Sequence, residues 1–184
     1  QVTGNLKFDV ALPVDQLARG RALRLSLRRD VVVIASTREG EDESFVRGVQ
    51  AQAAKPGAPL FVLVPRHPQR FESLRHLIED AGLSYARRSL GDPEPDAAIA
   101  VLLGDSMGEM AFYYGMADVA IVAGSFAPLG GQNLIEACVA AVPVIVGPHT
   151  FNFKQATEDA IMAGAATRVV DAEQAIKAAL RLLA

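Results

Sequence analysis

Residue types and patterns that mark several protein classes are scarce or missing in this chain. The single cysteine, Cys138, excludes an intramolecular disulfide and a cysteine-based zinc site. The three histidines are scattered, which argues against a metal site built from a histidine cluster. No apolar run approaches the ~20 residues that span a bilayer, and no charged leader followed by an apolar core opens the sequence. We therefore expect a soluble domain that needs no metal, with Cys138 packed in its core.

The chain also lacks an excess of positive charge. With a formal net charge of −3 and a pI of about 5.6, it has no global positive field that would indicate binding to nucleic acid. Its 184 residues, 51% of them hydrophobic, suffice for one globular domain, so we expect a single domain over residues 1–184. The sequence begins without methionine and enters a strand-like segment at residues 5–10. This start predicts a fragment of a longer protein, whose other parts would include any membrane anchor or partner domain.

Apolar, β-branched runs alternate with helical patterns along the whole chain. Strands are predicted over residues 31–35, 60–64, 84–89, 99–103, 119–122, 142–146 and 166–169. Helices are predicted over residues 14–27, 41–54, 71–81, 110–117, 134–139, 151–163 and 172–183. This alternation predicts an α/β fold, an open parallel sheet with helices on both faces, which binds ligands outside the carboxyl ends of its strands.

The stretch 125–136 joins a buried strand to a helical pattern through two adjacent glycines. Gly130 and Gly131 have no Cβ that would keep a ligand from the backbone, and free N–H groups at a helix start attract anions. The helix is expected to turn an apolar stripe toward the sheet, formed by Leu134, Ile135, Cys138 and Val139. The stretch is therefore interpreted as a phosphate-binding loop. An ordinary turn, in which glycine only supplies a positive φ, remains the alternative.

Four polar turns follow predicted strands and should meet at one edge of the sheet: 36–41, 65–67, 104–109 and 125–136. Arg66 is the candidate phosphate clamp, with a solvated surface arginine as the alternative. Glu136 either caps the helix or binds the vicinal hydroxyls of a ribose, and the role of Glu109 stays open. His149 is expected to hydrogen-bond rather than catalyse. Gly-x-Gly-x-x-Gly and Walker motifs are absent, which weakens assignment to NAD and ATP chemistry.

Five ordered motifs carry a resemblance to a known family. They are residues 2–9 (VTGNLKFD), 35–41 (ASTREGE), 104–109 (GDSMGE), 124–136 (GSFAPLGGQNLIE) and 147–153 (GPHTFNF). Together they resemble the C-terminal half of the 3-deoxy-D-manno-octulosonic acid (Kdo) transferases of Gram-negative bacteria. The resemblance covers nearly the whole chain.

The resemblance implies a GT-B glycosyltransferase, in which two Rossmann-like halves face each other and the C-terminal half binds the donor CMP-Kdo without a metal or other cofactor. Carried over residue by residue, the CMP contacts fall on Pro65, Arg66, Met107, Gly108, Glu109, Asn133, Leu134, Ile135 and Glu136. The loop glycines Gly130 and Gly131 complete the predicted nucleotide site. Ser36, Thr37, Ser125 and Gln132 are expected as additional donor contacts. The phosphate would lie against Arg66, the base near residues 107–109, and the ribose on Glu136.

The family's general base, its acceptor site for a lipid A precursor and its membrane-associating segment belong to the N-terminal half. The resemblance therefore implies that the full-length enzyme works at the cytoplasmic face of the inner membrane. It also implies that this fragment holds no catalytic residue, binds CMP weakly and transfers nothing alone. At two positions, Arg38 and Gln132, relatives often have histidine; both residues can still donate hydrogen bonds.

Two other functions remain open at the level of sequence. A GT-B transferase or sugar-nucleotide epimerase that uses a UDP-sugar would share the fold and the glycine-plus-glutamate arrangement. A non-catalytic nucleotide-binding module would share them too. The basic helix predicted at residues 14–27 either contacts anionic lipid or the missing half, or is a solvated face.

Overall fold

The protein forms one parallel seven-stranded sheet in the computed structural model, which describes residues 10–91 and 98–184. The strand order is β3-β4-β2-β1-β5-β6-β7, and all six strand pairings are parallel. The strands are β1 (Val31–Thr37), β2 (Leu60–Pro65), β3 (Tyr85–Arg87), β4 (Val101–Leu103), β5 (Val119–Val122), β6 (Val144–Val146) and β7 (Ala166–Arg168). The predicted α/β fold is thus confirmed. The motif at residues 2–9 and the strand expected at 5–10 (except residue 10) lie outside the described residues.

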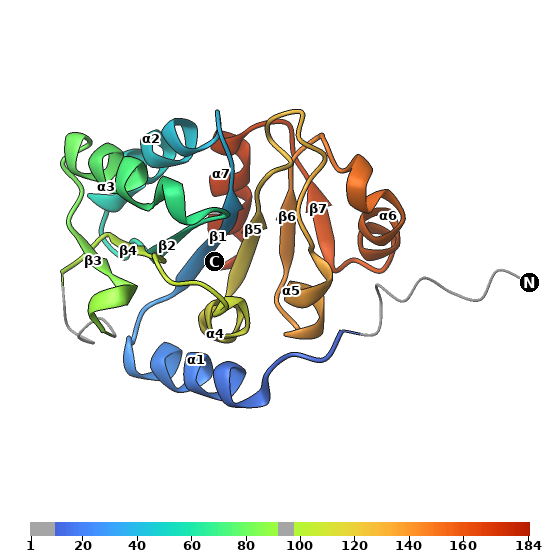
Figure 1. Ribbon diagram of the computed structural model, residues 1–184, viewed down its shortest axis with the longest axis horizontal. Coiled ribbons are helices and arrows are strands. Elements are labelled where there is room, and N and C mark those ends of the chain that lie inside the picture. The colour runs from blue at the N-terminus through green and yellow to red at the C-terminus, as the bar shows by residue number, and fades with distance from the viewer. Residues whose placement is uncertain (1–9, 92–97) are drawn as a thin grey trace, which may run out of the picture.

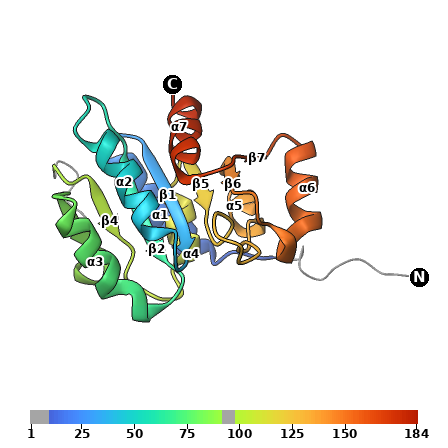
Figure 2. The same ribbon diagram turned by 90° about the horizontal axis from the view of Figure 1, so that it is seen from above.

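Helices cover both faces of the sheet (Figure 1). They are α1 (Val14–Ser26), α2 (Asp42–Ala53), α3 (Phe71–Asp80), α4 (Met110–Met116), α5 (Ile135–Val139), α6 (Lys154–Met162) and α7 (Ala172–Leu182). In β1, Val31 and Val33 belong to the core on the face covered by α1, α4, α5 and α6, whereas Val32 and Ile34 belong to the core on the face covered by α2, α3 and α7. Figure 2 shows α3 at one end of the sheet and α6 at the other. Because both faces are covered, the central strands are apolar at nearly every position.

The basic helix α1 packs tightly on α4 through two glycines. A Cβ added to Gly20 would lie 2.1 Å from the carbonyl oxygen of Phe112, and one added to Gly115 would lie 2.5 Å from that of Leu17. This close crossing lets the Gln16 side-chain amide donate to the Gly108 carbonyl at 3.0 Å. One side of α1 therefore supports the turn after β4. Contact of its outer side with lipid or another domain stays a prediction.

Several expected element boundaries differ from the structure. The strand predicted at 142–146 begins at Val144, since Pro143 has no N–H for the ladder. Residues 151–153 form a 3₁₀ turn before α6. Helix α5 has only five residues, because Ala141 adopts a left-handed φ of 62° and the Val142 N–H turns back to the Ala137 carbonyl.

The short α5 changes which residues form its sheet-facing side. Leu134 and Ile135 are buried as predicted, and Cys138 is half-buried against the core. Burial raises the pKa of the Cys138 thiol, which agrees with a packing role rather than a reactive one. Val139 was expected on the same stripe, but it is 46% exposed. That expectation was wrong because the chain leaves the helix directly after this residue.

Candidate functional site

A pocket of about 480 Å³ opens at the carboxyl ends of β1, β2, β4 and β5. In the sheet, β2, β4 and β3 lie on one side of β1, and β5, β6 and β7 lie on the other, so the strand order reverses at β1. Ligands of open α/β sheets bind at such a switch point. The lining residues are Ser36, Val64, Pro65, Arg66, Ser106, Met107, Gly108, Glu109, Met110, Tyr114, Gln132, Asn133, Glu136 and Phe153. The four turns that the sequence singled out therefore contribute to one cavity.

Most of the predicted donor contacts line this pocket. They are Ser36, Pro65, Arg66, Met107, Gly108, Glu109, Gln132, Asn133 and Glu136. Ser36 has a left-handed φ of 60° at a point where the pairing of β1 with β2 shifts register. This irregularity gives the strand end a local kink of the kind that re-aims a side chain beside a ligand site.

Six other predicted contacts are not among the lining residues: Thr37, Ser125, Gly130, Gly131, Leu134 and Ile135. Thr37, Ser125, Leu134 and Ile135 are buried. The Ser125 hydroxyl is already engaged, since it donates to the Val122 carbonyl and accepts from the Gly147 N–H, each at 2.8 Å. Its side chain therefore ties the loop after β5 to the end of β6.

The two loop glycines serve the loop's own fold. Both have left-handed backbones, with φ of 89° at Gly130 and 82° at Gly131. A Cβ on Gly130 would lie 2.3 Å from the Asn152 side chain, so the space that the glycine leaves is filled by the neighbouring loop. The Gly131 N–H donates to the Gly124 carbonyl at 2.8 Å. This geometry favours the turn interpretation of the glycines over direct approach of a ligand to their backbone.

The first part of the same loop already holds an anion, and that anion is the carboxylate of Glu41. It accepts the N–H groups of Gly124 at 2.8 Å, Phe126 at 2.9 Å and Ala127 at 3.2 Å. Glu41 is 1% exposed. Sequence reasoning placed Glu41 at the start of a helix and missed this contact. The N–H groups of Gly124, Phe126 and Ala127 are therefore not available to a bound phosphate.

The open donors of the loop lie further along, at the edge of the pocket. Within residues 10–91 and 98–184, the backbone N–H groups of Gln132 and Asn133 donate no hydrogen bond. Arg66 is exposed beside them, and its Nε donates to the Gln132 Oε1 at 3.2 Å. Among the described residues no carboxylate lies within 4.0 Å of the Arg66 guanidinium. Arg66 and two residues with unbonded backbone N–H groups therefore line the same cavity.

Glu136 and Asn133 form the carboxylate side of the pocket. The Asn133 side-chain amide donates to the Glu136 Oε1 at 3.1 Å, while its oxygen accepts the Ile135 N–H at 3.1 Å. Asn133 thus binds the first N–H of α5 and orients the glutamate at once. The Glu136 Oε2 accepts no hydrogen bond within the described part of the chain, and the side chain is half-buried. This oxygen can accept a bond from a ligand hydroxyl.

Glu109, by contrast, is held within the protein. Its carboxylate accepts from the Ser106 hydroxyl at 2.6 Å and from Arg88 at 2.8 Å. Burial raises the pKa of Glu109, but the hydrogen bonds from Ser106 and Arg88 outweigh it and lower the pKa overall. The carboxylate stays ionised and paired, so Glu109 shapes the wall more than it offers a free charge.

Sequence reasoning missed five of the residues that line the cavity: Val64, Ser106, Met110, Tyr114 and Phe153. Ser106 lay inside the quoted motif at 104–109, so its hydroxyl was a visible signal. Tyr114 and Met110 come from α4 and Phe153 from the turn before α6, where an apolar side chain is not distinguishable from a core residue by pattern alone.

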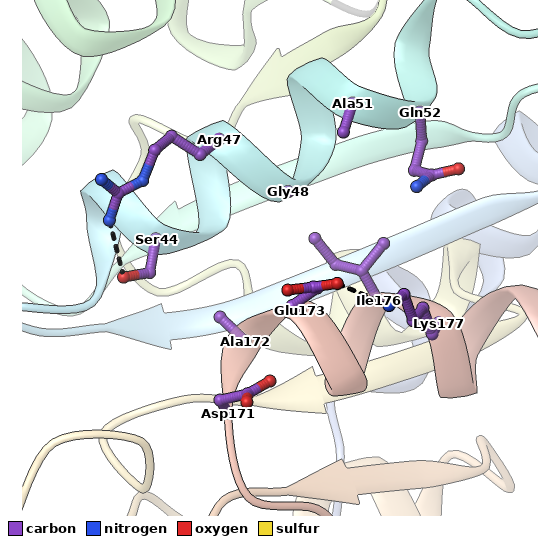
Figure 3. A pocket seen from close by; sticks show the side chains of 10 residues that line it. All are labelled: Ser44, Arg47, Gly48, Ala51, Gln52, Asp171, Ala172, Glu173, Ile176 and Lys177. Atoms are coloured by element: carbon purple, nitrogen blue, oxygen red, sulfur yellow. Dashed lines mark hydrogen bonds and ion pairs between the residues drawn. The ribbon is translucent and has the colours of Figure 1, made fainter.

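A second hollow, a groove of about 490 Å³ between α2 and α7, contains none of the predicted donor contacts (Figure 3). Gly48 and Ile176 lie at its floor, where a Cβ on Gly48 would be 2.4 Å from the Ile176 side chain. Its charged residues bond within their own helices, Arg47 to Ser44 and Lys177 to Glu173. The groove is the seam between two packed helices.

The described residues offer neither a metal site nor a membrane-spanning helix. In the part of the chain that the structure describes, no three His, Cys, Asp or Glu side chains gather closely enough to hold a metal ion. No described helix has the length and apolar composition needed to cross a bilayer.

Comparison with known proteins identifies relatives of the chain, although no protein-family model matches it. It is 60% identical over its whole length to the 3-deoxy-D-manno-octulosonic acid transferase of Bordetella pertussis, of which it covers 44%. It is 39% identical over 84% of its length to the transferase of the same name from Haemophilus influenzae, of which it covers 36%. The chain thus spans less than half the length of these curated relatives.

A solved structure is similar along almost the entire fold. The C-terminal CMP-Kdo binding domain of WaaA from Acinetobacter baumannii superposes with a TM-score of 0.87 and 31% identity. The match covers 93% of this chain and 90% of that domain. The expected fold, the C-terminal half of a GT-B glycosyltransferase, is confirmed by this similarity. On this match and on the two curated relatives, the chain belongs to the family of 3-deoxy-D-manno-octulosonic acid transferases.

Proposed function

We propose that this chain is the donor-binding half of a Kdo transferase and that it holds CMP-Kdo in the pocket at the carboxyl edge of the sheet. One observation carries the proposal: Arg66, which has no carboxylate partner among the described residues, and Glu136, whose Oε2 has no donor among them, belong to the same cavity. A nucleotide site needs a cation and a hydrogen-bond acceptor, because the phosphate is an anion and the ribose hydroxyls donate hydrogen bonds. The similar domain from Acinetobacter baumannii is described as binding CMP-Kdo.

The chemistry of the lining assigns each part of the nucleotide to one wall. The phosphate lies against Arg66 and the N–H groups of Gln132 and Asn133, where charge-assisted hydrogen bonds are strongest. The ribose hydroxyls donate to Glu136. The base lies near residues 107–109, where Met107 is 57% exposed and offers an apolar surface. The backbone of the loop and of the helix start holds these walls in place, at Gly130, Gly131, Leu134 and Ile135.

The same groups assist departure of the nucleotide. When the bond between Kdo and the phosphate oxygen breaks, its electron pair goes to that oxygen, and CMP leaves with an additional negative charge. Arg66 and the two free N–H groups lie where this charge develops and stabilise it. We propose that these donors suffice without a metal, so binding of CMP should be the same with and without a chelator.

The activity of the whole protein extends beyond this chain. We propose that the full-length enzyme transfers Kdo to a lipid A precursor at the cytoplasmic face of the inner membrane, with the general base and acceptor site in its other half. The pocket supplies one cation, Arg66, together with N–H donors and a ribose-binding carboxylate, and we assign to none of its groups the deprotonation of an acceptor. The chain alone should therefore bind CMP and transfer no Kdo.

Calorimetric titration of the isolated chain with CMP, UMP and UDP tests this proposal. We expect CMP to bind more tightly than UMP or UDP, because the base lies against a shaped wall at residues 107–109. Tighter binding of UDP would overturn the Kdo assignment in favour of an enzyme that uses a UDP-sugar. Absence of binding by all three would overturn the nucleotide site itself.

A further inference from the structure

The carboxylate of Glu41 lies in the interior next to the pocket, and four backbone N–H groups bind it. Besides the three donors from residues 124–127, the Arg38 N–H donates to its Oε2 at 2.8 Å. No lysine or arginine side chain in the described ranges pairs with it. A buried carboxylate is costly unless it is hydrogen-bonded, and N–H donors to a charged acceptor are among the stronger bonds. Glu41 therefore fastens the loop after β1 to the loop after β5.

The loop that Glu41 holds is connected to the donor pocket by direct contacts. The Gly124 carbonyl accepts the Gly131 N–H at 2.8 Å, so the two ends of the glycine loop are tied together. Gly124 has a left-handed φ of 70°, and a Cβ there would lie 2.8 Å from the Cγ of Gln132. The side chain of Gln132 thus rests on the backbone of the residue that Glu41 binds.

Gln132 in turn contacts Arg66, which closes a ring. Its Oε1 accepts from the Arg66 Nε at 3.2 Å, and the Arg66 backbone N–H donates to the Thr37 carbonyl at 3.0 Å. Thr37 precedes Arg38, whose N–H binds Glu41. Each of the three strand-end turns that carry Arg66, Gln132 and Arg38 is therefore fixed relative to the other two. Glu41 itself does not line the pocket.

We propose that Glu41 is a positioning residue for the donor nucleotide. It occupies the anion-binding position at residues 124–127, which leaves the N–H groups of Gln132 and Asn133 for the phosphate. It also sets the place of the Gln132 side chain and, through it, the direction of the Arg66 guanidinium. This inference rests on the proposed function, because it concerns the same pocket.

The variant Glu41→Gln tests the proposal. Glutamine has nearly the same shape, but in either orientation its NH₂ group would face two of the four backbone N–H groups. Because an NH₂ group accepts no hydrogen bond, two of the four bonds would be lost. We expect the CMP dissociation constant to rise about tenfold, as expected when charge-assisted bonds that orient a site are lost. The measurement is calorimetric titration at a temperature where circular dichroism shows the variant folded.

A matched control separates positioning from general stability. Asp118 also accepts a backbone N–H, from Val31 at 2.8 Å, but it directly precedes β5, at the end of the sheet away from the pocket. Asp118→Asn should therefore lower the free energy of unfolding without changing CMP affinity. If Glu41→Gln loses stability as Asp118→Asn does and keeps wild-type affinity for CMP, the positioning role is overturned.

Two further measurements decide the remaining outcomes. Should Glu41→Gln fail to fold, Glu41→Asp keeps the charge but is one methylene shorter, and wild-type CMP affinity in that variant would contradict the proposal. If wild-type protein fails to bind CMP, the proposed function fails. The NMR resonances of the Arg66 Nε–H and the Gln132 side-chain amide, recorded without nucleotide, then judge Glu41 separately. They are expected to shift in the variant, and unchanged resonances would overturn its positioning role.

Discussion

Replacement of Arg66 by alanine should weaken CMP binding with little effect on the fold. The side chain is exposed, and its one hydrogen bond within the described structure runs to Gln132 at 3.2 Å. Surface changes of this kind alter the free energy of unfolding by about 0.5 kcal/mol or less. A hydrogen bond to a charged phosphate contributes about 1.5–3 kcal/mol. Because Arg66 is open to solvent and screened by salt, the lower value applies, which corresponds to about a tenfold rise in the dissociation constant.

The matched control for this variant is Arg47→Ala. Arg47 is also an exposed arginine that donates to a neutral group, the Ser44 hydroxyl at 3.5 Å, but it lies in the groove between α2 and α7 (Figure 3). Calorimetric titration with CMP at low and at physiological salt compares the two. Arg66→Lys should fall between wild type and Arg66→Ala, since lysine keeps the charge but not the planar fork. Binding by Arg66→Ala within twofold of wild type, or an equal loss in Arg47→Ala, would refute the role of Arg66.

Three other changes have defined outcomes. Gly20→Ala places a Cβ 2.1 Å from the Phe112 carbonyl oxygen and should cost about 1–3 kcal/mol in urea unfolding; a variant as stable as wild type would contradict the packing of α1 on α4. Burial raises the pKa of Asp105, but bonds from Ser89 and Arg87 lower it overall, so its stabilisation holds above pH ~4 and is lost as pH falls further. Asp105→Asn should therefore flatten the fall in unfolding free energy between neutral and acid pH, and an unchanged slope would count against the Asp105 pairing. Glu136→Gln should remove a preference for CMP over 2′-deoxy-CMP, and a preference retained in the variant would exclude Glu136 as the ribose contact.

Local pattern was sufficient to predict the sheet and the edge at which the pocket forms. Buried strands such as β1 and β2 are continuous apolar runs, and the polar turns after them must share one edge in a parallel sheet. Sequence alone therefore predicts that Arg66, Glu109 and Glu136 share one edge of the sheet, and all three line one cavity. The length of α5 was less accessible, because it depends on the left-handed backbone of Ala141, a residue that rarely adopts it.

The side chains that bind and fill the glycine loop could not be predicted from local pattern. Glu41 and Gly124 are 83 residues apart, and nothing in either neighbourhood indicates that a carboxylate will fill the anion-binding position of the loop. The space beside Gly130 is likewise taken by Asn152, a contact made only in the folded chain. For the same reason the sequence left the role of Glu109 open, whereas in the fold Arg88 and Ser106 bind its carboxylate.

Mapping of CMP-induced NMR shifts tests the donor site most directly. The account predicts that CMP shifts the Arg66 Nε–H, the backbone amides of Gln132 and Asn133, and the Met107 methyl group. Residues of the groove between α2 and α7, such as Gln52 and Lys177, should not move. Shifts confined to that groove, or to residues 124–127 where Glu41 holds the backbone, would contradict it.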